Sequence, residues 1–206
     1  AITAVILLVF RDTILGFVTG VHVSTSKNMH VGDWIGIPKY NIEGNIQDIN
    51  LLTTKIVNFD KTISTIPTYD LLSTEIRNHQ VMYEGSSRRI KRSIYFNIKS
   101  FKFVDNEFYE KVKDINLISE YLDRKLREIA ESKKNIPHAE RIINGQQLTN
   151  IGLFRNYVLN YLKNNPKVDQ DEIVLVRQLE ISPQGMPLEI YCFANKAELV
   201  DYERIQ

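Results

Sequence analysis

The chain opens with an apolar run over residues 1–10. This run is about half as long as the roughly 20 apolar residues that a helix needs to cross a bilayer. It fits either a buried N-terminal helix of a soluble domain or the last half of a transmembrane helix. The residues that follow favour the membrane helix.

Apolar and small residues then separate onto two faces of one predicted helix. The bulky face holds Ile14, Phe17, Val18 and Val21, and the small face holds Asp12, Gly16, Thr19 and Gly20. Small residues at this spacing let helix backbones approach closely, above all where water cannot drive association. An amphipathic helix that continues an apolar one is typical of a segment turning along a membrane interface. Arg11 and Asp12 would then lie at the bend.

The segment from residue 31 to residue 78 predicts short strands with turn signals between them. Candidate strands cover residues 34–37, 44–50, 52–59 and 62–66, and the whole segment fits five short strands in about fifty residues. Leu52, Thr54 and Ile56 fall on one face of the third candidate. Asp60 and Lys61 predict a hairpin turn. So many short strands at close spacing fit a small, strongly bent sheet or an open barrel.

The C-terminal half predicts an α+β order, which suits a sheet covered on one face. A strand begins near residue 88 and runs to about residue 98, with Ile94, Phe96 and Ile98 on one face. Helical periodicity follows at Ile118, Leu122, Leu126 and Ile129, and again at Phe154, Tyr157, Val158, Tyr161 and Leu162. Residues 132–150 predict a loop, residues 172–181 and 188–194 a hairpin, and residues 198–206 the start of a helix.

Composition narrows the class of protein. The chain has 206 residues, a formal net charge of +1, 43% hydrophobic residues and 25% charged residues. It can bury the core of one or two domains, and its charge gives no global reason to expect a polyanion partner. The single cysteine, Cys192, excludes an internal disulfide framework and a cysteine-rich zinc site. The chain begins with Ala and no signal peptide is visible, so we expect a fragment of a longer protein.

No residue constellation predicts catalysis or a bound cofactor. The four histidines, at positions 22, 30, 79 and 138, have no metal-ligand spacing. Phosphate-loop, dinucleotide-binding and nucleophile-elbow motifs are missing from the sequence. Cys192 shares a predicted strand face with Leu188 and Ile190, which indicates a core thiol. We therefore expect no enzyme activity, no metal and no cofactor.

A basic run leaves three interpretations open. It comprises Arg88, Arg89, Lys91 and Arg92. The run fits a solvated linker best, and it could also bias the ions that enter a vestibule or contact a nucleic acid. Nucleic acid is the interpretation that we expect least.

Several stretches together resemble one family. They are VGDWI, GNIQDINLLTTKI, FDKTISTIPT and the closing IRN, preceded by the amphipathic helix. This pattern resembles the MscS family of mechanosensitive channels, and the later stretches are most similar to its YbdG-type (miniconductance) branch. The resemblance implies the end of a transmembrane pore helix over residues 1–30 and a small Sm-like β-barrel domain over 31–79. An α/β (ferredoxin-like) cytoplasmic domain follows over 80–206, cut within its last helix and carrying a helical insertion at about 117–162.

The resemblance also implies roles for single residues. Two seal positions of the pore correspond to Ala4 and Leu8, although the family usually has a bulky residue where this chain has Ala4. The pore helix would kink at Arg11 and Asp12, where the family commonly has Gly. A narrow apolar ring gates by dewetting. The small residues Gly16, Thr19 and Gly20 would pack against neighbouring elements. In the barrel, turns or bulges are implied at Gly32 and Gly44, and the rim at Asp33 and Trp34.

By resemblance the chain is a subunit of a tension-gated ion channel that releases ions and small solutes on hypo-osmotic stress. The implied partners are the lipid bilayer, permeating ions and identical subunits, seven in a ring. The implied location is the bacterial inner membrane, with the domains after residue 30 in the cytoplasm. Two alternatives from other classes are a non-conducting membrane scaffold and an Sm-like module that binds nucleic acid or protein.

Overall fold

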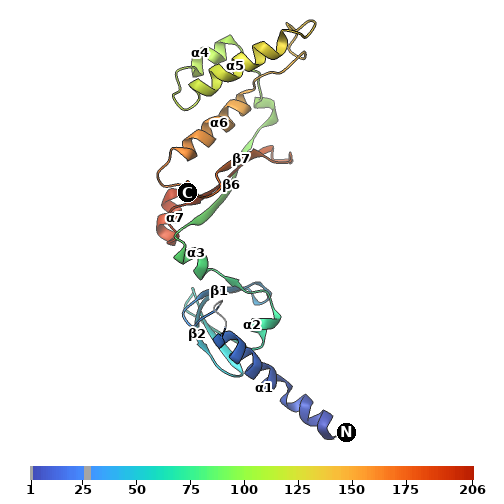
Figure 1. The fold of residues 1–206 in the computed structure, drawn as a ribbon, viewed down its shortest axis with the longest axis vertical. Coiled ribbons are helices and arrows are strands. Elements are labelled where there is room, and N and C mark those ends of the chain that lie inside the picture. The colour runs from blue at the N-terminus through green and yellow to red at the C-terminus, as the bar shows by residue number, and fades with distance from the viewer. Residues whose placement is uncertain (1, 26–28) are drawn as a thin grey trace. The chain divides into compact units, whose positions relative to one another are not determined.

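The computed structural model describes residues 2–25 and 29–206, and the side chains of residues 6, 8–22 and 29–206. The chain forms two compact units, Ala1–Gly85 and Ser86–Gln206 (Figure 1). The predicted boundary at residues 79–80 falls just before the point where these units meet. The predicted boundary at residue 30 lies inside the first unit and stays a prediction.

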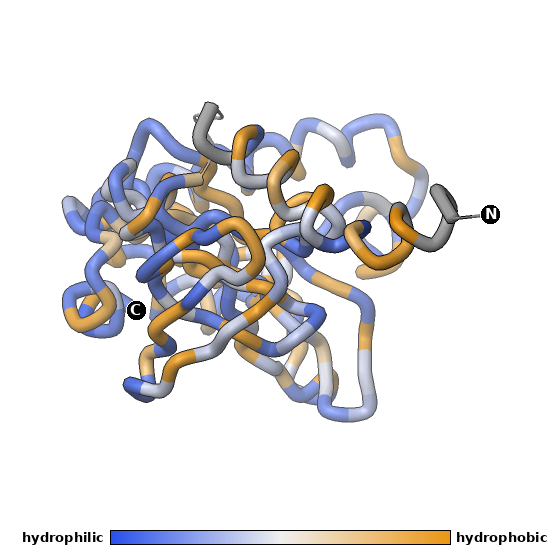
Figure 2. The backbone as a smooth tube through the Cα atoms, turned by 90° about the horizontal axis from the view of Figure 1, so that it is seen from below, coloured by the Kyte–Doolittle hydropathy of each residue, from blue (hydrophilic) through white to orange (hydrophobic). Residues whose placement is uncertain are grey.

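Helix α1 spans Ile2–Thr25 and runs through Arg11 and Asp12 as one helix. Hydrophobic residues recur along it (Figure 2). Within the part of the chain that is described, no helix has the length and hydrophobicity that a bilayer span requires. The kink and the place of α1 at the end of a membrane span therefore stay predictions.

The first unit contains an open five-stranded sheet in the order β4-β3-β2-β1-β5. Its strands are β1 (Trp34–Ile37), β2 (Ile42–Ile49), β3 (Thr53–Asn58), β4 (Ile63–Pro67) and β5 (Arg77–Asn78), and they pair in antiparallel fashion. The short helices η1 (Pro38–Tyr40), α2 (Asp70–Ser73) and α3 (Gln80–Glu84) complete the unit. The predicted series of short strands is confirmed, and we call residues 29–85 the β-domain.

Isoleucines form most of the core of the β-domain. The buried set is Ile35, Ile37, Ile46, Ile56, Ile66 and Leu71. The β-branched side chains of the isoleucines suit a pleated surface that is buried on one face. Thr54 and Ile56 face this core as predicted, but Leu52 is 53% exposed because it lies in the turn before β3.

The predicted hairpin turn at Asp60 and Lys61 joins β3 to β4. Lys61 has a φ of 71°, in the left-handed region. The backbone N–H and the hydroxyl of Thr62 both donate to Asp60 Oδ1, at 2.9 and 2.6 Å. These two donors lower the pKa of Asp60, the hydroxyl most strongly.

The second unit contains a three-stranded antiparallel sheet in the order β6-β8-β7. Its elements are β6 (Arg88–Phe96), η2 (Ile98–Ser100), α4 (Asn106–Val112), α5 (Ser119–Lys133), α6 (Asn150–Lys163), β7 (Leu175–Gln178), β8 (Met186–Ala194) and α7 (Leu199–Ile205). The series β6-α6-β7-β8-α7 follows the β-α-β-β-α part of the ferredoxin-like order. Helices α4 and α5 lie between β6 and α6. The bounds predicted for the insertion, 117–162, leave out α4 and include α6.

Two hydrophobic clusters meet at α6. One face of the sheet packs against Val158 and Leu162 of α6. The insertion has its own cluster, centred on Leu122 of α5 and Leu153 of α6. Tyr157 contacts both clusters, so α6 ties the insertion to the sheet.

Cys192 lies in the cluster beneath the sheet and is 1% exposed. Burial raises the pKa of its thiol, so the reactive thiolate is scarce near neutral pH. We expect iodoacetamide to label Cys192 at least about 100-fold more slowly in the folded protein than in denaturant, because access requires local opening. Peptide-resolved mass spectrometry measures both rates. Equal rates would contradict the burial of this strand face.

Candidate functional site

The small face of α1 packs against the turn between β2 and β3. Gly16 and Thr19 are buried, and the Thr19 hydroxyl donates to the Leu15 carbonyl at 2.8 Å. A Cβ added at Gly16 would overlap the carbonyl oxygen of Leu51 and lie 3.2 Å from its carbonyl carbon. Only glycine therefore allows α1 to lie this close to the turn. We call this Gly16–Leu51 approach the α1–turn contact.

Gly20 differs from Gly16 although both belong to the same small face. Among the described residues, nothing lies within 4 Å of a Cβ added at Gly20. Gly16 and Thr19 therefore pack within the chain, and Gly20 has room beside it. Gly16 lies against the turn of the β-domain. The predicted packing of the whole small face against neighbouring elements stays a prediction.

The bulky face of α1 is exposed. Its exposed fractions are 47% for Ile14, 58% for Phe17, 55% for Val18 and 51% for Val21. Nearer the start of the helix Leu8 is 74% exposed, whereas the side chain of Ala4 lies outside the described residues. An apolar face of this extent on a helix marks a surface for lipid or protein.

Two buried threonines hold the turn that meets Gly16. The hydroxyls of Thr54 and Thr68 lie 3.1 Å apart, and both residues are fully buried. Thr68 also donates from its hydroxyl to the Asn50 carbonyl at 2.6 Å, and its N–H donates to the Leu52 carbonyl at 3.0 Å. The carbonyls on either side of Leu51 are thus fixed to the core, which makes the turn a firm support for α1.

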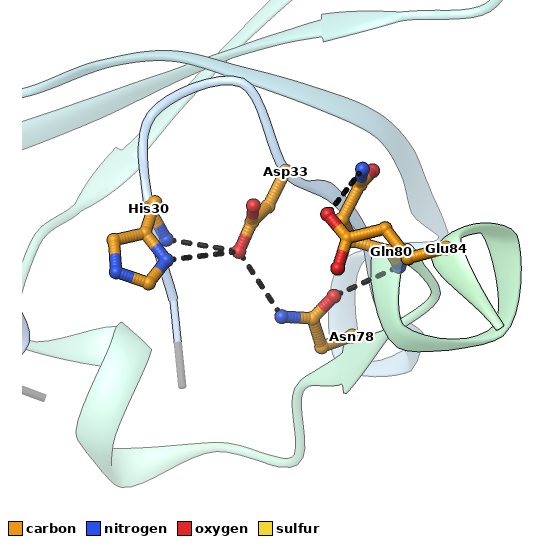
Figure 3. Close-up of polar contacts among 5 residues, drawn as sticks. All are labelled: His30, Asp33, Asn78, Gln80 and Glu84. Atoms are coloured by element: carbon orange, nitrogen blue, oxygen red, sulfur yellow. Dashed lines mark hydrogen bonds and ion pairs between the residues drawn. The ribbon is translucent and has the colours of Figure 1, made fainter. Parts of the chain in front are cut away.

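Asp33 fastens the segment after α1 to the end of the β-domain (Figure 3). Its Oδ2 accepts the backbone N–H of His30 at 2.9 Å and the amide of Asn78 at 3.1 Å. Asn78 in turn accepts the backbone N–H of Gln80 at 2.9 Å, at the start of α3. The His30 ring Nδ1 lies 3.8 Å from the same Asp33 oxygen and remains largely exposed. The Asp33 carboxylate therefore joins the segment after α1 to β5 and, through Asn78, to α3.

The remaining predicted rim residues lie around this carboxylate. Gly32 has a φ of 100° in the turn before β1, where its N–H donates to Ile46. Trp34 donates to Glu43 at 3.1 Å, and its ring lies against Phe59 and His79.

Gly44 is neither at a turn nor at a bulge, contrary to the prediction. It pairs inside β2, where a Cβ would overlap the Val57 carbonyl, and the register shift falls between Ile46 and Asp48. Close strand approach rather than a special backbone conformation selects glycine here.

A buried acid on α2 was not singled out by sequence reasoning. Asp70 is 1% exposed, accepts a hydrogen bond from the Tyr40 hydroxyl and lies 3.6 Å from the Lys39 ammonium. It ties η1 to α2 across the β-domain. Its neighbours in the sequence are Thr, Tyr and Leu, a pattern that predicts only a turn or a helix start.

The basic run at the start of β6 divides between the two faces of the sheet. Arg88 lies 4.6 Å from the centre of the Tyr202 ring of α7, on the face that the helices cover. Lys91 lies 3.8 Å from Glu189 on the opposite face, beside Arg89. Successive side chains of a strand point to opposite faces of the sheet, which causes this division. Arg92 therefore lies on the same face as Arg88. The four cations therefore do not form one patch.

Residues 12–81 match the family model described as "Mechanosensitive ion channel, beta-domain". This part of the chain belongs to the beta-domain family of mechanosensitive ion channels. The match to this family model begins inside α1, so it includes Gly16, the turn and the whole five-stranded sheet.

Curated members of the MscS family are similar to this chain over different lengths. The small-conductance mechanosensitive channel MscMJ of Methanocaldococcus jannaschii is 34% identical over 71 residues, which are 34% of this chain and 20% of MscMJ. The low conductance mechanosensitive channel YnaI of Escherichia coli is 24% identical over 185 residues, which are 90% of this chain and 39% of YnaI. The chain therefore spans from 20% to 39% of the length of these relatives.

Solved MscS-family structures share the fold. MSL1 of Arabidopsis thaliana superposes with a TM-score of 0.61 at 16% identity, covering 99% of this chain and 55% of that chain. The closed-state MscS of Helicobacter pylori has a TM-score of 0.56 at 16% identity, covering 99% of this chain and 62% of that chain. At such low identity the likeness shows the fold alone.

Replacing Asp33 with Ala should loosen β5 and α3, because Asn78 and the His30 N–H both lose their acceptor. Loss of a partly buried hydrogen-bonded carboxylate costs about 1–3 kcal/mol. We expect amide hydrogen exchange over residues 76–84 to rise about tenfold or more, with residues 53–58 unchanged. Asp48→Ala is the control, because Asp48 lies in the same sheet and, among the described residues, its carboxylate accepts a hydrogen bond only from Asn50. Equal exchange in the two variants would contradict the role of Asp33.

Proposed function

We propose that this chain is the pore-proximal helix and cytoplasmic part of a subunit of a membrane-tension-gated ion channel. In this proposal the channel releases ions and small solutes on hypo-osmotic stress. The match to the beta-domain family supports it, because the curated relatives are named as mechanosensitive channels. The observation that carries it is the α1–turn contact, which joins an apolar helix to a rigid β-domain with no side chain between their backbones.

The α1–turn contact would resist a movement of α1 relative to the β-domain. Tension favours the conformation with the larger area in the membrane plane, so the channel opens by a shift between two packings. If α1 tilts or slides during this shift, the close approach of Gly16 to Leu51 must change. The threonine-supported turn cannot follow freely, because its carbonyls are bonded to the core. The contact therefore contributes to the tension at which the packing changes.

The bulky face and the start of α1 have separate roles in the proposal. The bulky face lies toward lipid or neighbouring membrane helices, and Leu8 contributes to an apolar ring that seals the pore. Such a ring needs a closed cyclic arrangement of identical subunits. We infer seven subunits, a YbdG-type channel and a bacterial inner-membrane location from the family resemblance. A non-conducting scaffold is the outcome if the inserted oligomer passes no current under tension.

Replacing Leu8 with Asn should ease hydration of the sealing ring. A polar ring lowers the free energy of water entry, so the closed state loses part of its advantage. We expect patch-clamp recordings of the full-length channel in liposomes to show opening at lower tension, with about a tenfold shift of the open-to-closed ratio at fixed tension. Val9→Asn is the control, because Val9 is equally exposed and points about 100° away around the helix. Matching shifts in both variants would place the seal elsewhere.

Replacing Gly16 with Ala should weaken the α1–turn contact. The new methyl group must push α1 away from the Leu51 carbonyl, and overpacking of this kind costs about 1–3 kcal/mol. We expect the channel to leave the conformation described here at lower tension, measured as the threshold relative to a reference channel in the same patch. Gly20→Ala is the matched control, because a Cβ there meets no atom of the described residues within 4 Å. The proposal fails if the two alanine variants shift the threshold alike.

A further inference from the structure

A polar groove of about 320 Å³ lies in the helical insertion. One wall comes from the start of α5 and the other from the second half of α6, two helices that lie side by side in Figure 1. The α5 wall presents Glu120, Tyr121 and Arg124, and the α6 wall presents Asn156, Asn160 and Asn164. The groove has the size of a small-ligand site, and its lining is mostly polar.

Hydrogen bonds fix the α6 wall. The three asparagines are four residues apart, so they lie on one face of the helix. The amide of Asn160 donates to the Leu117 carbonyl at 2.6 Å and to Asn156 Oδ1 at 3.0 Å, and Asn164 donates to the Asn160 carbonyl at 2.8 Å. Among the described residues no partner is recorded for the Asn156 amide nitrogen or for the Asn160 side-chain oxygen. The wall therefore offers one oriented donor and one oriented acceptor.

The α5 wall carries one charge of each sign. Glu120 and Arg124 are one turn apart, a spacing at which such residues commonly pair. Here Arg124 instead lies 3.9 Å from Glu128 and 5.7 Å from the centre of the Tyr121 ring. No cation within 4.0 Å of Glu120 is recorded in the described part of the chain. Both charged groups therefore keep hydrogen-bonding capacity beside the groove.

We propose that this groove binds a small zwitterion, a free amino acid with a polar side chain. The ligand's carboxylate would pair with the Arg124 guanidinium, whose fork matches a carboxylate. Its ammonium group would donate to Glu120, and its side chain would exchange hydrogen bonds with Asn156 and Asn160. Opposite charges on one wall favour a net-neutral ligand over an anion or a cation. At about 30 Å³ for each water of the liquid, the groove holds roughly 10 waters, which leaves room for one polar amino acid together with several waters.

Calorimetry of the full-length channel in detergent tests the site, with L-glutamine as the probe. We expect saturable binding with one site per subunit. N-acetyl-L-glutamine lacks the ammonium and L-glutamine α-amide lacks the carboxylate, so each should bind at least about tenfold more weakly. Calorimetry measures binding without any ion current. A failure to bind L-glutamine can therefore be distinguished from a failure of the proposed channel activity. Absence of saturable heat with an assembled, folded channel would overturn the proposal, as would equal binding of glycerol.

Substitutions test which group of the ligand binds to Arg124 and which binds to Glu120. Arg124→Gln should weaken L-glutamine binding about tenfold and abolish the preference over the α-amide. Glu120→Gln should do the same for the preference over the N-acetyl compound. Arg127→Gln and Glu131→Gln are the matched controls, because they remove the same charges from the same helix outside the groove. The assignment is wrong if the controls weaken binding as much as the groove variants. Size-exclusion chromatography verifies that each variant assembles.

Discussion

The close approach of two backbones, at Gly16 and Leu51, is the constraint on which the first unit depends. No side chain lies between them, so a single methyl group at position 16 would force them apart. A contact of this kind is stiff, because packed groups have no spare rotamers with which to absorb a displacement. It is also short-ranged, so it is either made or lost as the helix moves. These two properties suit a helix that changes position between discrete packings.

The turn that contacts α1 is stiff because hydrogen bonds hold it to the interior of the β-domain. A carbonyl on an ordinary surface loop would yield to a neighbouring helix. Here the hydroxyl of Thr68 holds Asn50, and its N–H holds Leu52, on either side of Leu51. Thr68 is itself paired to Thr54 among the isoleucines of the core. Buried hydroxyls with satisfied hydrogen bonds fix geometry that apolar packing alone leaves free. The Asp33 carboxylate fixes a second part of the domain, where it bonds both His30 and Asn78.

The periodicity of the sequence made most helices and strands predictable. The contacts between residues far apart in the sequence could not be predicted from it. The first strand, the hairpin turn and the helices α5 and α6 follow from local periodicity and turn chemistry. The division of the basic run also follows from alternation, because odd and even positions of β6 face opposite sides. The small face of α1 was visible as a pattern, yet the pattern could not say that Gly16 meets a carbonyl while Gly20 meets space. Asp70 was missed because its partner Tyr40 lies thirty positions away and no local signal links them.

The insertion shows how a fold can gain a surface without disturbing its sheet. Helix α6 serves two clusters, with Val158 and Leu162 toward the sheet and Leu153 toward α5. A helix that is apolar on two sides has only a narrow polar strip left, and the asparagines occupy that strip. Amide side chains there can bond the partner helix through Asn160 without burying a charge. The polar groove between α5 and α6 is thus what remains when two helices share a small core and diverge beyond it. Its charged wall is held by α5 alone, so changes at Glu120 or Arg124 leave the packing of α6 on the sheet intact.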